Sequence, residues 1–128
     1  MTYEQSLLLK RAAERRGRRG EFLAMLLLVA KGYRILGRRV RTHGGEIDMV
    51  ARSLRGIVCF VEVKTRNSLR EAQQAIRPRQ EIRIARAAEL FIAQRPWLAP
   101  KGVRFDTIIV SDRTWPRHLR DAWRPRAR

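Results

Sequence analysis

The sequence predicts an α/β fold in which a sheet lies between other layers. Three strand-like segments follow one another closely, and a fourth follows a helix-like segment near the C-terminal end. Residues 57–61 are apolar at every position, which is typical of a central strand covered on both faces. A chain of 128 residues with 45% hydrophobic residues is consistent with one globular domain over residues 1–128.

The charge is strongly unbalanced. Lys and Arg number 29 and Asp and Glu number 12, so the net charge is +17. Because 25 of the 29 cations are Arg, codon bias in a GC-rich genome could explain the choice of Arg over Lys. It does not explain the excess of positive charge. The charge therefore favours an acidic partner, and nucleic acid is the commonest one.

Several classes of protein are excluded early. A single cysteine, Cys59, allows no disulfide framework and no thiolate zinc site, which suits a cytoplasmic location. Two histidines are too few for a His-rich metal cluster. The apolar run at residues 22–30 is about half the length that a membrane span needs, so we expect no membrane partner.

The first element predicted is a long helix. Thr2 and Gln5 have the spacing of a capping box, which favours a helix from Tyr3 through Arg15. We expect Gly17 and Gly20 to interrupt this helix, the helical pattern then to continue to Lys31, and Gly32 to end it. Residues 22–30 are apolar all round, so a second cover besides the sheet is expected. The C-terminal tail and another protomer are both candidates.

Three strands are predicted next, at Tyr33–Arg41, Glu46–Arg52 and Ile57–Arg66. Gly44 and Gly45 separate the first two, and residues 53–56 separate the last two. Such short connections indicate antiparallel neighbours.

The second half of the chain alternates between helix and strand. A short helix is predicted at Asn67–Ile76, a longer one at Pro78–Gln94 and a fourth strand at Val103–Ser111. The longer helix has an apolar arc and an opposite basic stripe; the arc is Ile82, Ile84, Ala85, Ala88 and Ile92, and the stripe is Arg79, Arg83 and Arg86. The tail from Asp112 is expected to form a short helix packed by its tryptophans, with a frayed basic end.

Charged residues interrupt two neighbouring strands. Glu62 and Lys64 share a face of the third strand because residues two apart do so. If the hairpin turns through residues 54–56, with Gly56 in the left-handed conformation, Asp48 lies opposite Glu62 and Glu46 lies opposite Lys64. A four-residue loop would shift the register by one and put Asp48 on the other face.

Two carboxylates so close together repel each other unless a cation lies between them. Mg²⁺ or Mn²⁺ suits such oxygen ligands, and Lys64 would then stand beside the metal. This combination indicates metal-assisted phosphodiester hydrolysis. The alternative is that Glu62 and Lys64 only pair with each other at a sheet edge.

The motifs Gly44-Gly45-Glu46-Ile47-Asp48, Phe60-Val61-Glu62-Val63-Lys64-Thr65-Arg66 and Arg104-Phe105-Asp106 closely resemble the YraN family of small bacterial proteins. That family is similar in turn to the PD-(D/E)xK nucleases. The resemblance covers residues 17 to about 123. It implies a mixed central sheet with helices on both faces, a restriction-endonuclease-like fold, and a site at one end of the hairpin.

The resemblance also implies roles for individual residues. Asp48, Glu62 and the carbonyl of Val63 would be metal ligands, and Lys64 would be the motif's lysine. Glu21 resembles the helix-borne acid of resolvase-like members, which orients a metal-bound water or helps hold a second metal ion, although it could equally balance Arg18, Arg19 and the helix dipole. Gln80 resembles a polar residue near the nucleophile, although an exposed helical Gln is commoner. Asp106 is expected to be structural, paired with a nearby Arg.

Basic residues near the site are expected to hold the nucleic-acid backbone without reading its sequence; these are Arg18, Arg19, Arg66, Arg79 and Arg83. A solvated helix face is the alternative for the stripe on the longer helix. The function expected is a metal-dependent endonuclease for structured or branched nucleic acid, with DNA favoured over RNA and a homodimer as one arrangement. The alternatives are a non-catalytic binding module with the same fold and a metal-independent RNase that uses His43 and His118.

Overall fold

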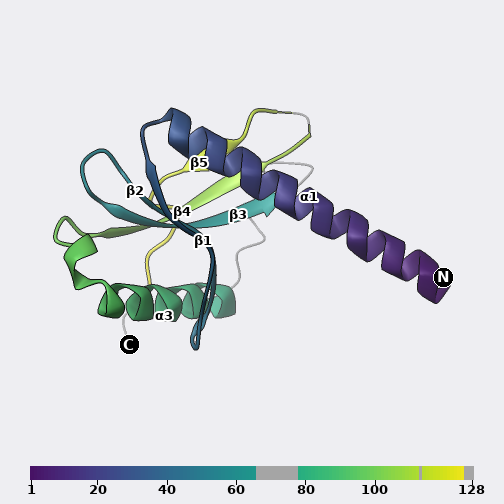
Figure 1. The fold of residues 1–128 in the computed structure, drawn as a ribbon, viewed down its shortest axis with the longest axis horizontal. Helices are drawn as coiled ribbons and strands as arrows, with labels where there is room; N and C mark the ends of the chain where they lie inside the picture. The colour runs from purple at the N-terminus through teal and green to yellow at the C-terminus, as the bar shows by residue number, and fades with distance from the viewer. Residues whose placement is uncertain (66–77, 113, 126–128) are drawn as a thin grey trace.

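The computed structural model describes residues 1–65, 78–112 and 114–125, and it shows a mixed sheet between two helices (Figure 1). The elements in chain order are α1 (Tyr3–Ala30), β1 (Arg34–Thr42), β2 (Gly45–Arg52), β3 (Val58–Thr65), α3 (Pro78–Gln94), a 3₁₀ turn η1 (Pro96–Leu98), β4 (Val103–Val110) and β5 (Arg117–Leu119). The strands lie in the order β1-β2-β3-β4-β5, and β3 and β4 are parallel whereas the other neighbours are antiparallel. The predicted α/β fold class is confirmed.

The middle strand, β3, packs against both helices. Phe60 belongs to a cluster with Ile84 and Phe91 of α3, whereas Cys59 belongs to a cluster with Leu28 of α1. Alternate residues of β3 therefore enter separate cores on the two faces of the sheet. This explains why the strand is apolar at consecutive positions, as the sequence indicated.

The β2–β3 hairpin has the predicted three-residue loop. Gly56 has a φ of +88°, in the left-handed region that favours glycine. The N–H of Ser53 donates to the carbonyl of Ile57 at 2.9 Å, which closes the loop. The paired register then runs from Arg52↔Val58 to Met49↔Val61, as expected.

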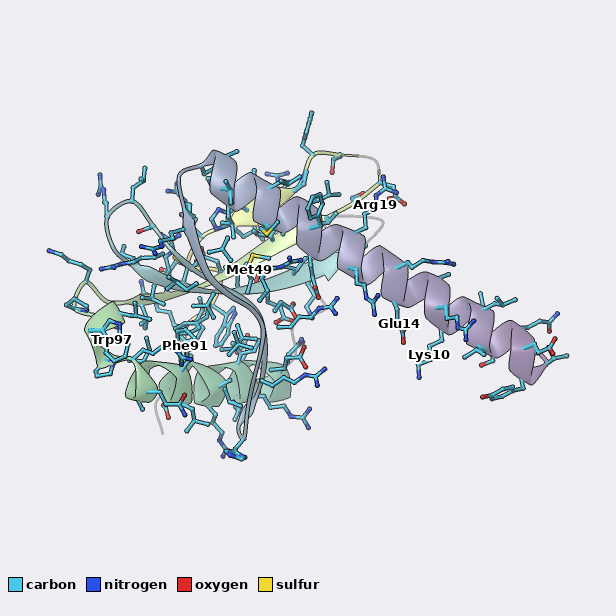
Figure 2. All side chains as sticks on the ribbon, viewed as in Figure 1. Lys10, Glu14, Arg19, Met49, Phe91 and Trp97 are labelled. Atoms are coloured by element: carbon cyan, nitrogen blue, oxygen red, sulfur yellow. The ribbon has the colours of Figure 1, made fainter. Side chains whose placement is uncertain are left out.

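Helix α1 is one continuous helix of 28 residues, and the capping box of Thr2 and Gln5 is present. The prediction that Gly17 and Gly20 interrupt the helix is wrong, because both lie within it. Gly20 instead permits close packing on β3, since a Cβ there would lie 2.5 Å from Thr65 Oγ1. The N-terminal half of α1 extends beyond the sheet, and Lys10 and Glu14 mark this part (Figure 2).

The second cover expected over residues 22–30 is only partial. Phe22, Leu26 and Val29 remain 49%, 46% and 53% exposed. Residues around Trp115 run beside α1 and leave an apolar groove of about 720 Å³ between the two. Among the described residues, no helix is both long enough and apolar enough to cross a membrane.

The tail does not form the expected helix. Residues 117–119 form strand β5, which pairs with β4, and Trp123 packs against Phe105 with the ring centroids 4.5 Å apart and the ring planes tilted by 35°. Trp115, in contrast, is 89% exposed. The extended conformation allows His118 and the backbone N–H of Asp121 to reach Asp106, which a helix would not permit.

Helix α3 has the predicted bounds, although Ile82 is half exposed rather than part of the buried arc. The short helix predicted at residues 67–76 lies outside the described residues. The β1–β2 turn packs on the basic side of α3. A Cβ on Gly44 would lie 2.9 Å from Arg86 Cβ and 3.2 Å from its backbone carbon. Glycine at position 44 therefore sets how closely the turn approaches α3.

Replacing Gly44 with Ala is expected to lower the free energy of unfolding by about 1–3 kcal/mol, because the new Cβ would collide with the α3 backbone. Gly17→Ala is the matched control, since no atom lies within 4 Å of the added Cβ. It should raise helix stability by about 0.5–1 kcal/mol. Urea unfolding measures both, and equal effects of the two variants would contradict the close approach at Gly44.

Candidate active site

The candidate site lies where β2 and β3 separate. Beyond the Met49↔Val61 pair, the N–H of Val63 donates to Asp48 Oδ2 at 2.8 Å. Asp48 therefore bonds to the backbone of β3 beyond the last paired residues. The predicted position of Glu46 opposite Lys64 is wrong, since the β2–β3 register ends before Glu46 and its carboxylate lies 3.6 Å from Arg41.

Glu62 and Lys64 form a largely buried ion pair. Lys64 Nζ lies 3.1 Å from Glu62 Oε1, and both side chains are only 10% exposed. Gln80, in the first turns of α3, donates from Nε2 to the same Oε1 at 2.7 Å. Glu62 and Lys64 thus pair with each other, as the alternative expected, although they do so on the central strand of the sheet rather than at its edge.

The environment of Asp48 raises the pKa of its carboxyl to about 7. Removal from water is the largest cause, and repulsion by the Glu62 carboxylate is the second. Glu21 also raises this pKa, whereas the Val63 N–H and Lys64 lower it. The carboxylates of Glu62 and Glu21 thus both act on Asp48.

Glu21 joins this region from α1. Its carboxylate is 17% exposed and accepts a hydrogen bond from Arg39 Nε at 2.8 Å. Arg39, rather than Arg18 or Arg19, is therefore its ion-pair partner. The hydrogen bond with Glu21 is the main cause of the raised pKa of Arg39, and the charges of Glu21, Glu46 and Asp48 add to it.

Sequence reasoning missed Arg39. It lies within β1 with a φ of +49°, in the left-handed region that side-chain-bearing residues rarely adopt. Glycine and asparagine are the usual signals for this conformation, and an arginine inside a basic segment gives none. Its contact with Glu21 also joins residues from two separate elements, so no spacing in the chain could indicate it.

The donors at this site are the hard oxygen ligands that suit Mg²⁺ or Mn²⁺. No group of three or more His, Cys, Asp or Glu side chains within the described ranges is arranged to hold a metal ion as it stands. The carboxylates of Asp48 and Glu62 nevertheless crowd negative charge that a cation would relieve. Because the N–H and C=O of a strand residue lie on the same edge, the Val63 carbonyl also faces β2. This donor set fits the expected ion.

The other predicted binding residues are more dispersed. Arg18 and Arg19 are exposed on α1 just before Glu21, and Arg83 is exposed on α3. Arg79 belongs to the first turn of α3, and Arg66 lies outside the described residues.

The two histidines do not form an acid–base pair. His43 lines a cavity beside Phe91 on the α3 face of the sheet. His118 contacts Asp106 at 2.7 Å and Lys31, the residue that caps the C-terminal end of α1, at 2.6 Å. The structure therefore offers no support for an RNase that uses both of them.

Asp106 is a fully buried acid with a structural environment, as predicted. Arg104 donates to both of its carboxylate oxygens at 2.8 Å, and His118 and the backbone N–H of Asp121 also contact it. Burial alone would raise its pKa, but the hydrogen bonds from His118, Arg104 and Asp121 lower it to about 2. Asp48 has fewer hydrogen-bond donors around its carboxylate, and its pKa is raised instead of lowered.

A mixed sheet between helices, with Asp48, Glu62 and Lys64 gathered where two strands part, defines an α/β protein consistent with a restriction-endonuclease-like fold. Comparison with known proteins identifies the family. Residues 20–110 match the model of the uncharacterised protein family UPF0102, and the chain belongs to that family, which is also called YraN.

Named relatives match most of the chain. A UPF0102 protein of Parvibaculum lavamentivorans is 48% identical over 89% of this chain and 85% of its own length. One from Maricaulis maris is 50% identical over 91% of both chains. One from Methylorubrum extorquens is 46% identical over 89% of this chain and 88% of its own length. The names of these relatives assign no activity, so the site geometry is the basis for a function.

The raised pKa of Asp48 makes stability depend on pH. Between the ordinary value of 3.8 and about 7, the folded protein binds more protons at this carboxyl than the unfolded chain does. The free energy of unfolding therefore falls as pH rises through that range. In EDTA near pH 8, Asp48→Asn is expected to be more stable than the wild type by on the order of 1–3 kcal/mol, and below about pH 4 the difference should disappear.

Urea unfolding at a series of pH values measures this difference. Asp112→Asn, at an exposed carboxylate, is the control and should change stability by less than about 0.5 kcal/mol. An Asp48→Asn protein less stable than the wild type near pH 8 would contradict the account.

Proposed function

We propose that this protein is a metal-dependent endonuclease that hydrolyses phosphodiester bonds in structured or branched nucleic acid, with DNA favoured over RNA. The observation that carries the proposal is the meeting of Asp48, Glu62 and Lys64 at the open end of the β2–β3 hairpin. The net charge of +17 supports a polyanionic substrate. A cytoplasmic location is part of this proposal.

A divalent ion would be held by the carboxylates of Asp48 and Glu62 and by the Val63 carbonyl. When bound, it would lower the pKa of an attacking water and neutralise charge on the phosphate. Asp48 suits this role because burial and repulsion from Glu62 disfavour its ionised form, and a bound cation would stabilise that form.

Lys64 and Gln80 complete the site. Lys64 Nζ, held 3.1 Å from Glu62, is positioned to orient the attacking water or to neutralise charge that develops on the phosphate. Gln80 donates to Glu62 Oε1 and fixes the orientation of that carboxylate. Gln80 is therefore a positioning residue in this proposal.

Arginines on α1 and α3 would hold the backbone of the nucleic acid, and of these Arg18, Arg19 and Arg83 are exposed. Arg18 and Arg19 precede Glu21 on α1, and Arg79 and Arg83 lie on the first half of α3. Such contacts orient a duplex without reading its sequence, which suits a substrate recognised by structure.

A homodimer also stays a prediction, and light scattering of the purified protein tests it.

Cleavage assays test the proposal directly. Labelled duplex, single-stranded, flap and four-way-junction DNA are incubated with Mg²⁺ or Mn²⁺, with EDTA as the metal-free arm. The wild type should cleave at least one structured substrate. Asp48→Asn, Glu62→Gln and Lys64→Met should each lower the rate by at least about 100-fold, because each removes a ligand or a stabilising charge.

Asp112→Asn and Gly17→Ala are the control variants and should cleave at the wild-type rate. Salt-sensitive binding without cleavage by the wild type would favour the non-catalytic binding module. Cleavage that persists in Asp48→Asn and Lys64→Met would refute the assigned site.

A further inference from the structure

Arg39 occupies an unusual backbone conformation beside the site. Arg38 pairs with Met49 and Val40 pairs with Ile47, so Arg39 lies across from Asp48. Its φ of +49° is uncommon for a residue with a long side chain. Backbone strain of this kind tends to occur at functional sites, where another contact compensates for it. The side chain of Arg39 makes such a contact, with Glu21.

Within the described part of the chain, the guanidinium of Arg39 is held on one edge only. Its Nε donates to Glu21 Oε2 at 2.8 Å, while its remaining N–H groups have no hydrogen-bond partner among the described residues. The side chain is 43% exposed, so these groups are accessible from solvent. A half-exposed ion pair of this type contributes little to stability. The free edge has the planar fork that matches two phosphate oxygens.

The negative charge of the site indicates what the exposed N–H groups of Arg39 could bind. Asp48, Glu62 and Glu21 would repel a phosphodiester, and the nearest lysine, Lys64, is engaged by Glu62. A cation beside Asp48 and outside the Glu62–Lys64 pair would offset this repulsion. Arg39 meets that description, since Glu21, Glu46 and Asp48 all act on its charge.

We infer that Arg39 is a phosphate-positioning residue. Glu21 holds its Nε, and its free N–H groups bind the non-bridging oxygens of the phosphodiester that lies against Asp48 and Glu62. The inference rests on the proposed nuclease function and adds a residue that grips the substrate. It also gives Glu21 a definite part, which is to orient Arg39.

A general effect of positive charge is the competing explanation, and Arg38 is the matched control for it. Arg38 is the adjacent residue of the same strand, is exposed, and has no ion-pair partner among the described residues. If charge alone mattered, substitutions at positions 38 and 39 would have equal effects. If the fork geometry of Arg39 mattered, even a lysine there would fail, because it cannot bind Glu21 and a phosphate in the same way.

The experiment compares Arg39→Lys and Arg39→Asn with Arg38→Lys and Arg38→Asn. Binding of a fluorescein-labelled four-way junction is followed by anisotropy in EDTA, and cleavage is followed in Mg²⁺ or Mn²⁺. Arg39→Lys should lower kcat/KM at least about tenfold, and Arg38→Lys should change it less than about twofold. Arg39→Asn should fold at least as well as the wild type, because asparagine tolerates the left-handed conformation, yet bind the junction more weakly than Arg38→Asn.

A double substitution tests the part given to Glu21. If Glu21 orients Arg39, the loss caused by Arg39→Lys should be smaller in a Glu21→Gln background, because the orientation is already lost. If the wild type cleaves and substitutions at positions 38 and 39 have equal effects, this inference is overturned and the proposed function stands. A wild type that cleaves no substrate would overturn the proposed function and the inference with it.

Discussion

The hydrogen bond from the Val63 N–H to the Asp48 carboxylate is the interaction on which the rest of the site depends. It forms beyond the last paired residues of β2 and β3. There the backbone N–H of Val63 binds a carboxylate instead of a backbone carbonyl of β2. Asp48 is thereby held beside Glu62, and a cation between the two carboxylates would relieve their repulsion. The hairpin loop at Gly56 sets the register that brings these residues to the same place.

Two acids of this protein show how partners decide the state of a buried carboxylate. Asp106 is fully buried, yet Arg104, His118 and a backbone N–H hold it firmly ionised, with a pKa of about 2. Asp48 is removed from water and faces the Glu62 carboxylate, and its one backbone hydrogen bond offsets this only in part, so its pKa rises to about 7. The first arrangement stabilises the junction between β4 and the tail. The second is costly unless a ligand of opposite charge binds, which is why we place the function there.

Much of this architecture was predictable because it is local in the chain. The capping box at Thr2 predicts where α1 begins, the glycine of the hairpin loop predicts the register, and the apolar run at residues 57–61 predicts the central strand. The failures come from contacts between distant elements. The tail forms a strand because Asp106 binds His118 and Asp121, and Arg39 meets Glu21 across two elements. Sequence spacing carries no record of either contact.

The central claim is that Asp48 must be ionised for a divalent cation to bind beside Glu62. Calorimetric titration with Mn²⁺ near pH 7, in buffers of different ionisation enthalpy, measures both binding and the protons released. With a pKa of about 7 for Asp48, the account predicts that Mn²⁺ binds with release of roughly half a proton, and that Asp48→Asn abolishes the release and weakens binding. Equally tight Mn²⁺ binding by Asp48→Asn, or binding without proton release, would contradict it.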